Sequence, residues 1–259
     1  MHNFKKKFGQ NFITDTNLLK AIVSDGEINN EDEVLEIGAG AGSLTKQLSE
    51  QAKKVVAYEI DKDLQPTLES LELNNVKFIY KDALKEPIKE IEKEFSGTYK
   101  IVANLPYYIT TPLIFKFLTE TNKVTSLTIM VQKEVADRIV AKEGSKDYGV
   151  LSVMCQFYSL PKITRIVKRQ MFYPIPNVDS AIVTMKKKEM PKDINIYQFE
   201  QFVKKCFSMR RKTLLNNLSG YNNMSKEEIV NKLGEEMSNK RAETLSLEDF
   251  LKMFKQFKI

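Results

Sequence analysis

The tetrapeptide Asn104-Leu105-Pro106-Tyr107 follows the apolar run 99–103, and its groups suit chemistry on the amino group of a flat ring. An exocyclic adenine nitrogen is a weak nucleophile because its lone pair is delocalised into the ring. The Asn104 side-chain oxygen and the Leu105 carbonyl can accept its two hydrogens and aim the lone pair at an electrophilic methyl group. Pro106 stiffens the turn, and Tyr107 can stack on an extruded base. The tetrapeptide therefore predicts methyl transfer to a base, with a plain Asn-x-Pro turn as the alternative.

A glycine-rich motif, Glu-Ile-Gly-Ala-Gly-Ala-Gly at residues 36–42, also follows an apolar run. Gly38, Gly40 and Gly42 allow a tight turn and a close approach of the backbone to a ligand. Their spacing is closer than that of the dinucleotide pattern, which favours a nucleoside without a pyrophosphate. A simple glycine-rich turn is the alternative, because short glycine motifs often occur by chance.

Acidic residues follow the next two apolar runs. Glu59 lies about 20 residues beyond the glycines, where a carboxylate can accept hydrogen bonds from ribose hydroxyls. Asp61 beside it is better explained as a turn or cap residue. Asp82 suits an adenine amino group, with Ala83 offering a backbone N–H, and a helix cap is the alternative for Asp82. Glycines, an acid and a second acid at three successive strand ends predict a ligand at the carboxyl edge of a sheet.

A proline-stiffened segment, 172–180, lies between two later apolar runs. Either Phe172 or Tyr173 can close on the second face of an extruded base. Core packing is the alternative for either ring, because it is the usual fate of an aromatic residue beside a strand.

Apolar, β-branched runs alternate with helical patterns, which predicts an α/β fold with right-handed crossovers and a parallel sheet. The expected strands are 34–38, 55–60, 76–82, 99–105 and 126–132, and the expected helices lie near 43–51, 63–72, 87–95, 111–120 and 133–141. Two further strands, 162–168 and 181–187, leave no room for a helix between them. This last pair should therefore be antiparallel, and the sheet should have seven strands in all.

The pattern changes after a run of three lysines at 186–188, and residues 190–193 look like a linker. Beyond them, apolar residues recur at helical spacing in 197–207, 212–218, 225–233 and 246–257. Ser225 and Ser246 stand three residues before acids, as in a capping box. We therefore expect two domains: an α/β domain over 1–188 and a small, all-helical domain over 189–259.

Several kinds of protein are excluded by composition. No apolar run approaches the ~20 residues that cross a membrane, and the basic N-terminus is not followed by a signal-peptide core. His2 is the only histidine, and Cys155 and Cys206 lack metal-ligand spacing. We expect a cytoplasmic protein that uses no metal and no histidine base. No extension beyond the last helix is expected.

The combination of motifs resembles the KsgA/RsmA family of ribosomal RNA adenine dimethyltransferases. The resemblance covers nearly the whole chain and is carried by the segments 8–12, 36–42, 104–109, 172–180, 211–218 and 241–246. It implies a Rossmann-like, seven-stranded class I methyltransferase sheet, S-adenosylmethionine as cofactor, and a monomer acting on the small ribosomal subunit or its precursor. The implied reaction is N6,N6-dimethylation of two adjacent adenosines in the hairpin loop near the 3′ end of the subunit's RNA.

The resemblance also implies roles for individual residues. The cofactor-binding residues would be Asn11, Ile13, Gly38, Gly40, Glu59, Asp82, Ala83 and Asn104. The catalytic residues would be Asn104, Leu105, Tyr107 and Phe172, with the last two forming a sandwich around the flipped adenine. One departure is Ile13, where family members often have Leu.

The net charge of +6 is unevenly distributed. Residues 1–100 carry 14 Lys/Arg and 18 Asp/Glu, a net of −4, whereas residues 101–259 carry 26 and 16, a net of +10. This fits a small cofactor on one side and a polyanion on the other, although a solvated lysine-rich surface is the simpler explanation. The expected RNA contacts are Arg165, Lys168, Arg169, Lys204, Lys205, Arg210, Arg211 and Lys212.

Three rival functions stay open. A large-subunit adenine methyltransferase of the macrolide-resistance type shares the chemistry, but the segments 104–108 and 211–218 favour the small-subunit group. DNA adenine methylation is less consistent, because such enzymes usually carry Asp or Asn followed by Pro-Pro-Tyr. A binding protein that occupies immature small subunits as an assembly checkpoint is compatible with the enzyme reading.

Overall fold

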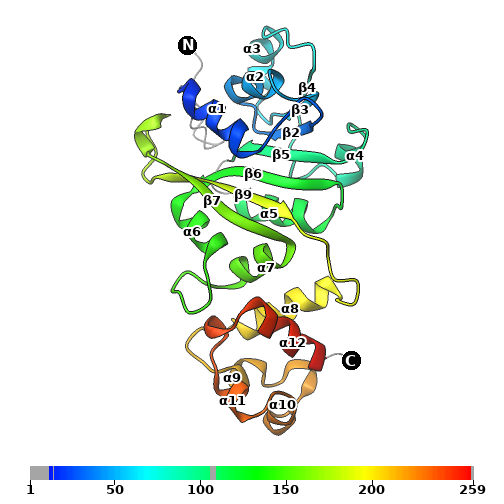
Figure 1. The fold of residues 1–259 in the computed structure, drawn as a ribbon, viewed down its shortest axis with the longest axis vertical. Helices are drawn as coiled ribbons and strands as arrows, with labels where there is room; N and C mark the ends of the chain where they lie inside the picture. Colours follow the sequence, from blue (N-terminus) through cyan, green and yellow to red (C-terminus); the bar gives the residue numbers. More distant parts are fainter. Residues whose placement is uncertain (1–11, 14, 106–108, 258–259) are drawn as a thin grey trace. The chain divides into compact units, whose positions relative to one another are not determined.

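The computed structural model describes residues 12–13, 15–105 and 109–257 (Figure 1). The chain forms two compact units. The sheet unit comprises Met1–Ala136 and Ser159–Lys187, and the helical unit comprises Asp137–Tyr158 and Lys188–Ile259. The junction after Lys187 lies one residue from the expected domain boundary. Asp137–Tyr158, which lies inside the expected first domain, groups instead with the C-terminal helices.

The sheet unit contains a seven-stranded sheet in the order β4-β3-β2-β5-β6-β9-β7 (Figure 1). Its strands are β2 (Glu33–Ile37), β3 (Lys54–Tyr58), β4 (Val76–Ile79), β5 (Tyr99–Asn104), β6 (Val124–Gln132), β7 (Ser159–Val167) and β9 (Ser180–Lys187). The strands from β2 to β6 are parallel, and β9 runs antiparallel to both of its neighbours, β6 and β7. The predicted α/β fold, its seven strands and its antiparallel end are therefore confirmed.

A second, small sheet was not predicted from the sequence. β1 (Phe12–Ile13) pairs antiparallel with β8 (Phe172–Tyr173), with Phe12 opposite Tyr173 and Ile13 opposite Phe172. A strand of two residues is too short to show a periodic pattern, and β1 and β8 lie far apart in the sequence. Neither strand could therefore be recognised from its local sequence.

Helices cover both faces of the large sheet, as a buried parallel sheet requires. The helices of this unit are α1 (Thr16–Asp25), α2 (Ser43–Ser49), α3 (Gln65–Glu69), α4 (Ile88–Glu92), α5 (Thr110–Thr119) and the start of α6 (Lys133–Val140), with 3-10 turns η2 (Lys62–Leu64) and η4 (Arg169–Met171). On one face, Ile22 of α1 and Leu48 of α2 join a core cluster with Val34, Val55 and Val102. α5 lies on the opposite face (Figure 1).

Helix α1 is absent from the elements expected from the sequence. The Asp15 side chain caps it, accepting hydrogen bonds from the backbone N–H groups of Asn17 at 2.7 Å and Leu18 at 3.1 Å. Leu18, Ile22 and their neighbours are buried at helical spacing. A cap residue followed by such spacing is a recognised helix start, so this helix was predictable.

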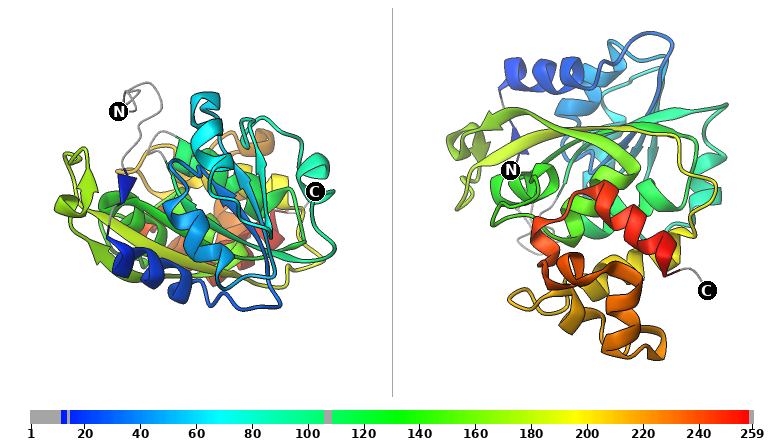
Figure 2. Two further views of the ribbon diagram at one scale, coloured as in Figure 1. Left: turned by 90° about the horizontal axis from the view of Figure 1, so that it is seen from above. Right: turned by 60° about the horizontal axis from the view of Figure 1, so that its bottom comes forward.

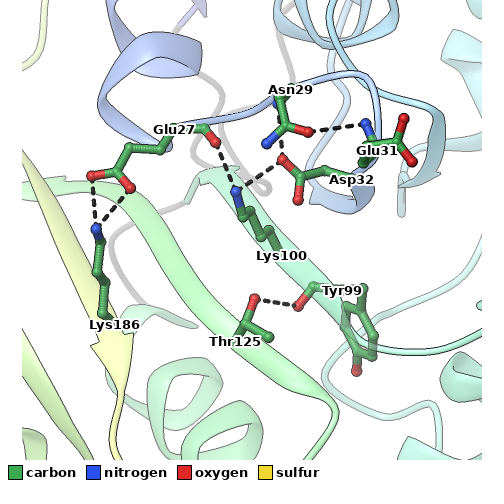
Figure 3. A network of polar contacts seen from close by, with 8 residues as sticks. All are labelled: Glu27, Asn29, Glu31, Asp32, Tyr99, Lys100, Thr125 and Lys186. Carbon is green, nitrogen blue, oxygen red and sulfur yellow. Dashed lines mark hydrogen bonds and ion pairs between the residues drawn. The ribbon is translucent and has the colours of Figure 1, made fainter.

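A polar network closes the amino edge of the sheet, far along the strands from their carboxyl ends (Figure 3). The Lys100 ammonium at the start of β5 donates to the Glu27 carbonyl at 2.7 Å and to the Asp32 carboxylate at 2.8 Å. Lys186 at the end of β9 pairs with the Glu27 side chain at 2.7 Å. The loop between α1 and β2 is therefore tied to two strands.

The two lysines of this network should differ in their effect on stability. The Lys100–Asp32 pair is only 19% and 17% exposed, whereas the Lys186–Glu27 pair is 59% and 64% exposed. We expect Lys100→Met to lower the free energy of unfolding by about 1–3 kcal/mol and the melting temperature by several degrees. Lys186→Met should leave the melting temperature nearly unchanged, because this pair is exposed to solvent. Calorimetric melting of both variants checks this, and equal shifts would contradict it.

The helical unit contains α7 (Val150–Tyr158), α8 (Ile196–Cys206), α9 (Leu214–Leu218), α10 (Lys226–Leu233), α11 (Glu235–Asn239) and α12 (Leu247–Gln256). Both α7 and α8 pack on α12 (Figure 2). The rings of Phe157 and Phe199 lie 4.7 Å apart, and those of Phe199 and Phe254 lie 5.4 Å apart. This aromatic core explains why the segment with α7 groups with the C-terminal helices.

The predicted capping boxes at Ser225 and Ser246 are both confirmed. In each, the serine hydroxyl accepts from the backbone N–H three residues later, and that residue's carboxylate accepts in return. Among the residues that the structure describes, every helix is too short or too polar to cross a membrane.

Candidate active site at the carboxyl edge of the sheet

The strand order brings the predicted site residues to one edge. Four parallel strands lie side by side in the order β4-β3-β2-β5. Ile37 at the end of β2 lies opposite both Tyr58 of β3 and Ala103 of β5, and Tyr58 lies opposite Ile79 of β4. The four parallel strands therefore end at one level. The direction of the chain connections reverses between β2 and β5, which is where open α/β sheets bind ligands.

The three glycines of the glycine loop have a left-handed backbone conformation that other residues rarely adopt. Gly38, Gly40 and Gly42 have φ values of 83°, 57° and 82°. A side chain on Gly42 would place its Cβ 2.3 Å from Leu71 Cδ1. A Cβ on Gly38 would lie 3.5 Å from the carbonyl oxygen of Asn104, so the two motifs are direct neighbours. The turn exposes backbone rather than side chains to whatever occupies the edge.

Glu59 ties this loop to the end of β3. Its carboxylate, only 5% exposed, accepts from the Gly40 N–H at 2.7 Å and from the Asp61 N–H at 2.8 Å. Burial raises the pKa of Glu59, and the N–H groups of Asp61 and Gly40 oppose that rise by stabilising the charged form. Asp61 itself caps η2, which confirms its interpretation as a cap.

Asp82 and Ala83 lie on a loop after β4. The Asp82 side chain accepts from the Leu84 N–H at 3.0 Å, and Ala83 is buried. A lysine from α5, Lys116, supports this loop by donating to the Leu84 carbonyl at 2.8 Å and to the Glu86 carbonyl at 2.5 Å. Lys116 is 7% exposed, and burial lowers its pKa. Sequence reasoning missed this residue, although a lysine on an otherwise apolar helix face was a signal.

The structure describes some, but not all, of the residues that are expected to contact the target base. Asn104 ends β5 beside Gly38, and Leu105 is buried at 2% exposure. Asn11 and Tyr107 lie outside the described residues. Ile13 and Phe172 face each other across the small sheet, and each is 4% exposed. Both belong to the core cluster that includes Ala39 of the glycine loop.

Glu36 is a further acid that sequence reasoning did not assign. It is fully buried on β2, two residues before Gly38. Among the described residues, neither its carboxylate oxygens nor the Thr45 hydroxyl have a hydrogen bond of ordinary geometry. Burial raises the pKa of Glu36 to about 8, the Thr45 hydroxyl opposes this rise, and the Glu59 charge adds a smaller contribution to it. The glycine loop therefore rests on a carboxyl group that is protonated at neutral pH.

A pH-dependent stability follows from Glu36. Below its ordinary pKa of 4.5 the carboxyl is protonated in both the folded and the unfolded chain. Between there and a pKa of about 8, only the unfolded chain ionises, so stability falls by up to about 1.4 kcal/mol per pH unit. Glutamine stays neutral. We expect the melting temperature of Glu36→Gln to rise relative to that of the native protein as the pH is raised from 5 to 8. The same comparison for Glu50→Gln, at an exposed position, should show no such rise. If the melting temperatures of the native protein and Glu36→Gln change in parallel with pH, the prediction is wrong.

The predicted RNA contacts of the sheet unit engage acidic partners. Arg165 pairs with Asp25 through two bonds of 2.8 and 3.1 Å. Lys168 lies 3.1 Å from Asp179, whose carboxylate also accepts from the Arg169 N–H at 3.0 Å. The Arg165 and Lys168 side chains are 46% and 70% exposed, whereas the Asp25 and Asp179 side chains are 12% and 27% exposed.

The predicted contacts of the helical unit gather at the end of α8. Lys204 pairs with Glu200 at 2.6 Å and Arg210 with Glu243 at 3.4 Å. Lys205 is half-buried, while Arg211 and Lys212 are exposed.

A buried amide supports the turn with these cations. Asn217, 1% exposed, donates to the carbonyls of Cys206 at 2.7 Å and Met209 at 3.2 Å, and accepts from the Met209 N–H at 3.0 Å. Its oxygen also accepts from the Ser208 hydroxyl at 3.2 Å. Asn217 thus holds the basic turn 208–212 in place, a role that the sequence alone did not reveal.

Comparison with known proteins supplies the context for this geometry. The model of a family described as ribosomal RNA adenine dimethylase matches residues 1–258. A ribosomal RNA small subunit methyltransferase A from Geobacillus sp. (strain WCH70) is 45% identical over 262 residues, which cover 96% of this chain and 89% of the relative. Its counterpart from Clostridioides difficile (strain 630) is 44% identical over 259 residues, covering 96% and 90%.

Two solved structures share the fold over nearly the whole chain. A dimethyladenosine transferase from Plasmodium falciparum has a TM-score of 0.84 and 28% identity, covering 95% of this chain and 97% of its own. The 23S rRNA methyltransferase ErmE has a TM-score of 0.72 and 26% identity, covering 95% and 99%.

Proposed function

Because this chain belongs to the ribosomal RNA adenine dimethylase family, we propose that it dimethylates N6 of two adjacent adenosines in small-subunit ribosomal RNA, in the hairpin loop near the 3′ end. The methyl donor is S-adenosylmethionine. The observation that carries the proposal is the contact between the two motifs: Gly38 of the glycine loop lies against the Asn104 carbonyl at the carboxyl edge of the sheet. Donor and acceptor sites are therefore neighbours.

The residues at this edge fit a sulfonium nucleoside. Gly38 and Gly42 present backbone without side chains. Each oxygen of the Glu59 carboxylate keeps a second lone pair after accepting from Gly40 and Asp61, and these lone pairs would accept the ribose hydroxyls. Asp82 and the Ala83 N–H would hold the adenine, with Asn11 and Ile13 lining the site. When bound, the cofactor supplies a methyl group on a positively charged sulfur.

The target adenine is prepared by hydrogen-bond acceptors rather than by a base. The Asn104 side-chain oxygen and the Leu105 carbonyl would accept both N6 hydrogens and leave the lone pair aimed at the methyl group. The proton becomes acidic once the nitrogen is alkylated, so water can take it. Tyr107 would stack on the base. Phe172, which is 4% exposed, would close on the other face of the base. The rate of methyl transfer would come from aligning the N6 lone pair with the methyl group.

The small subunit is favoured over the large one by the relatives. Proteins named for the small subunit are 44–45% identical to this chain, whereas ErmE is 26% identical.

In this proposal residues 1–188 bind the cofactor, and residues 189–259 contact RNA through the basic turn. The protein acts as a cytoplasmic monomer. Affinity for the subunit should fall steeply with salt, as it does for contacts to phosphates.

Mass spectrometry of ribosomal RNA tests the proposal. Small subunits purified from cells that lack these methyl groups are incubated with the protein and isotope-labelled donor, with large subunits treated in parallel. We expect four labelled methyl groups, two on each of two neighbouring adenosines, in small-subunit RNA only. Label in the large subunit, or none in either, would refute the proposal.

A further inference from the structure

The loop between β8 and β9 exposes an unusual group of apolar side chains. Tyr173, Ile175 and Val178 are 62%, 61% and 44% exposed, and all three fall within six residues. Single exposed apolar residues are common on protein surfaces, but a group of them on one loop usually marks a contact with another molecule. We call these three residues the loop patch.

The loop that carries the patch is held at its base. The Asp179 carboxylate accepts from the Arg169 N–H at 3.0 Å and from the Lys168 ammonium at 3.1 Å. The Arg169 guanidinium donates to the Asn177 carbonyl at 3.2 Å, and the Lys133 N–H donates to the Asp179 carbonyl at 3.0 Å. Pro174 and Pro176 restrict the backbone further. The patch is therefore presented by an ordered segment, which lowers the entropic cost of binding.

The patch adjoins the candidate active site through β8. Successive residues of a strand point to opposite sides. Phe172 is buried in the core cluster that includes Ala39 of the glycine loop, and Tyr173, the next residue, is exposed to solvent. One residue of this short strand thus packs behind the site and the next faces outward beside it.

The charge around the patch selects the kind of partner. The preceding strand and turn carry four cations, Lys162, Arg165, Lys168 and Arg169. Two of them have acidic partners, Asp25 for Arg165 and Asp179 for Lys168. The side chains of Arg165 and Lys168 are 46% and 70% exposed. Aromatic and apolar side chains flanked by cations match single-stranded nucleic acid, whose bases stack while its phosphates seek positive charge.

We infer that the loop patch binds the unpaired nucleotides that flank the target adenosine in the RNA loop, with the Tyr173 ring stacking on one of these bases. This inference rests on the proposed function and extends it. Extrusion of the target leaves its neighbours without a stacking partner, and the Tyr173 ring would replace that partner. The patch would thereby hold the loop open while the target adenine occupies the site.

The test uses the full-length protein and a synthetic hairpin with the fluorescent base 2-aminopurine beside the target adenosine. Three variants are compared with the native protein: Tyr173→Ala, Tyr173→Phe and Tyr197→Ala. Tyr197 is the matched control, an aromatic residue 71% exposed on α8. Methyl transfer, cofactor affinity and fluorescence on RNA binding are measured for each.

We expect Tyr173→Ala to lower kcat/KM for the RNA about tenfold or more, the loss typical of one stacked base. The loss should appear in KM, with cofactor affinity unchanged and with less quenching of the 2-aminopurine. Tyr173→Phe, which keeps the ring, and Tyr197→Ala should both behave as the native protein does.

Native kinetics and quenching in Tyr173→Ala would overturn the inference while the proposed function stands. Loss of cofactor affinity in this variant would also overturn it, because the ring would then belong to the cofactor site. A native protein that transfers no methyl group would refute the proposed function itself.

Discussion

Replacement of Asn104 by Ala is expected to reduce methyl transfer to small-subunit RNA by at least about a thousandfold while leaving the fold intact. Removing a single preorganised hydrogen-bonding group from a reacting centre costs about 10²–10³ in rate, and Asn104 also orients the nucleophile. The half-buried side chain lies at the end of β5, and the backbone carbonyl that contacts the Gly38 region is retained in the variant. The fold should therefore survive, as circular dichroism and melting would show.

The control for this variant is Asn29→Ala. Asn29 is an exposed asparagine at the amino edge of the same sheet, where its side chain accepts from the Glu31 N–H (Figure 3). It should transfer methyl groups at the native rate. Near-native turnover by Asn104→Ala would refute the role assigned to Asn104.

The same variant separates catalysis from a checkpoint role. If cells with Asn104→Ala match a deletion strain in growth and ribosome maturation, catalysis is the function that matters. If the inactive copy is worse than deletion, the protein blocks maturation by binding without release.

Replacement of Glu59 by Ala is expected to weaken cofactor binding about a hundredfold or more. Hydrogen bonds to a charged group are worth about 1.5–3 kcal/mol. Glu59 makes two of these to the Gly40 and Asp61 N–H groups and would accept two more from the ribose. Loss of the carboxylate therefore removes ligand contacts and also loosens the glycine loop. Calorimetric titration with S-adenosylmethionine measures the effect.

Two further variants sharpen this result. Glu59→Gln keeps one acceptor oxygen and should fall between the native protein and Glu59→Ala. Glu50→Ala removes an exposed acid just after α2 and should leave affinity unchanged. Native affinity in Glu59→Ala would show that the nucleoside binds elsewhere.

Much of the fold was predictable because the strands are apolar and separated by amphipathic helices. The positions of Gly38, Glu59, Asp82 and Asn104 at successive strand ends follow from that pattern alone, since parallel strands end at one edge. Their assembly there did not depend on details of packing.

Other features depend on contacts between distant residues and leave no local pattern. Helix α7 is only nine residues long, mostly apolar and almost entirely buried, and periodicity alone does not distinguish a short apolar run of this kind from a buried strand. The roles of Lys116 and Asn217 come from carbonyl groups that only the folded backbone brings near them. Glu36 was visible within the motif, but its burial was not.

The pairing of β1 with β8 has a consequence for biosynthesis. Ile13 meets Phe172 only after most of the sheet unit has been translated, because residues 172–173 come just before its last strand. Chains emerge at about 5–20 residues per second and fold from the N-terminus onward. The roughly 160 residues between Ile13 and Phe172 therefore take about 8–30 seconds to synthesise, and the N-terminal segment lacks its partner for that time. A nascent chain arrested before residue 172 would expose Ile13 to chaperones, however complete its first strands were.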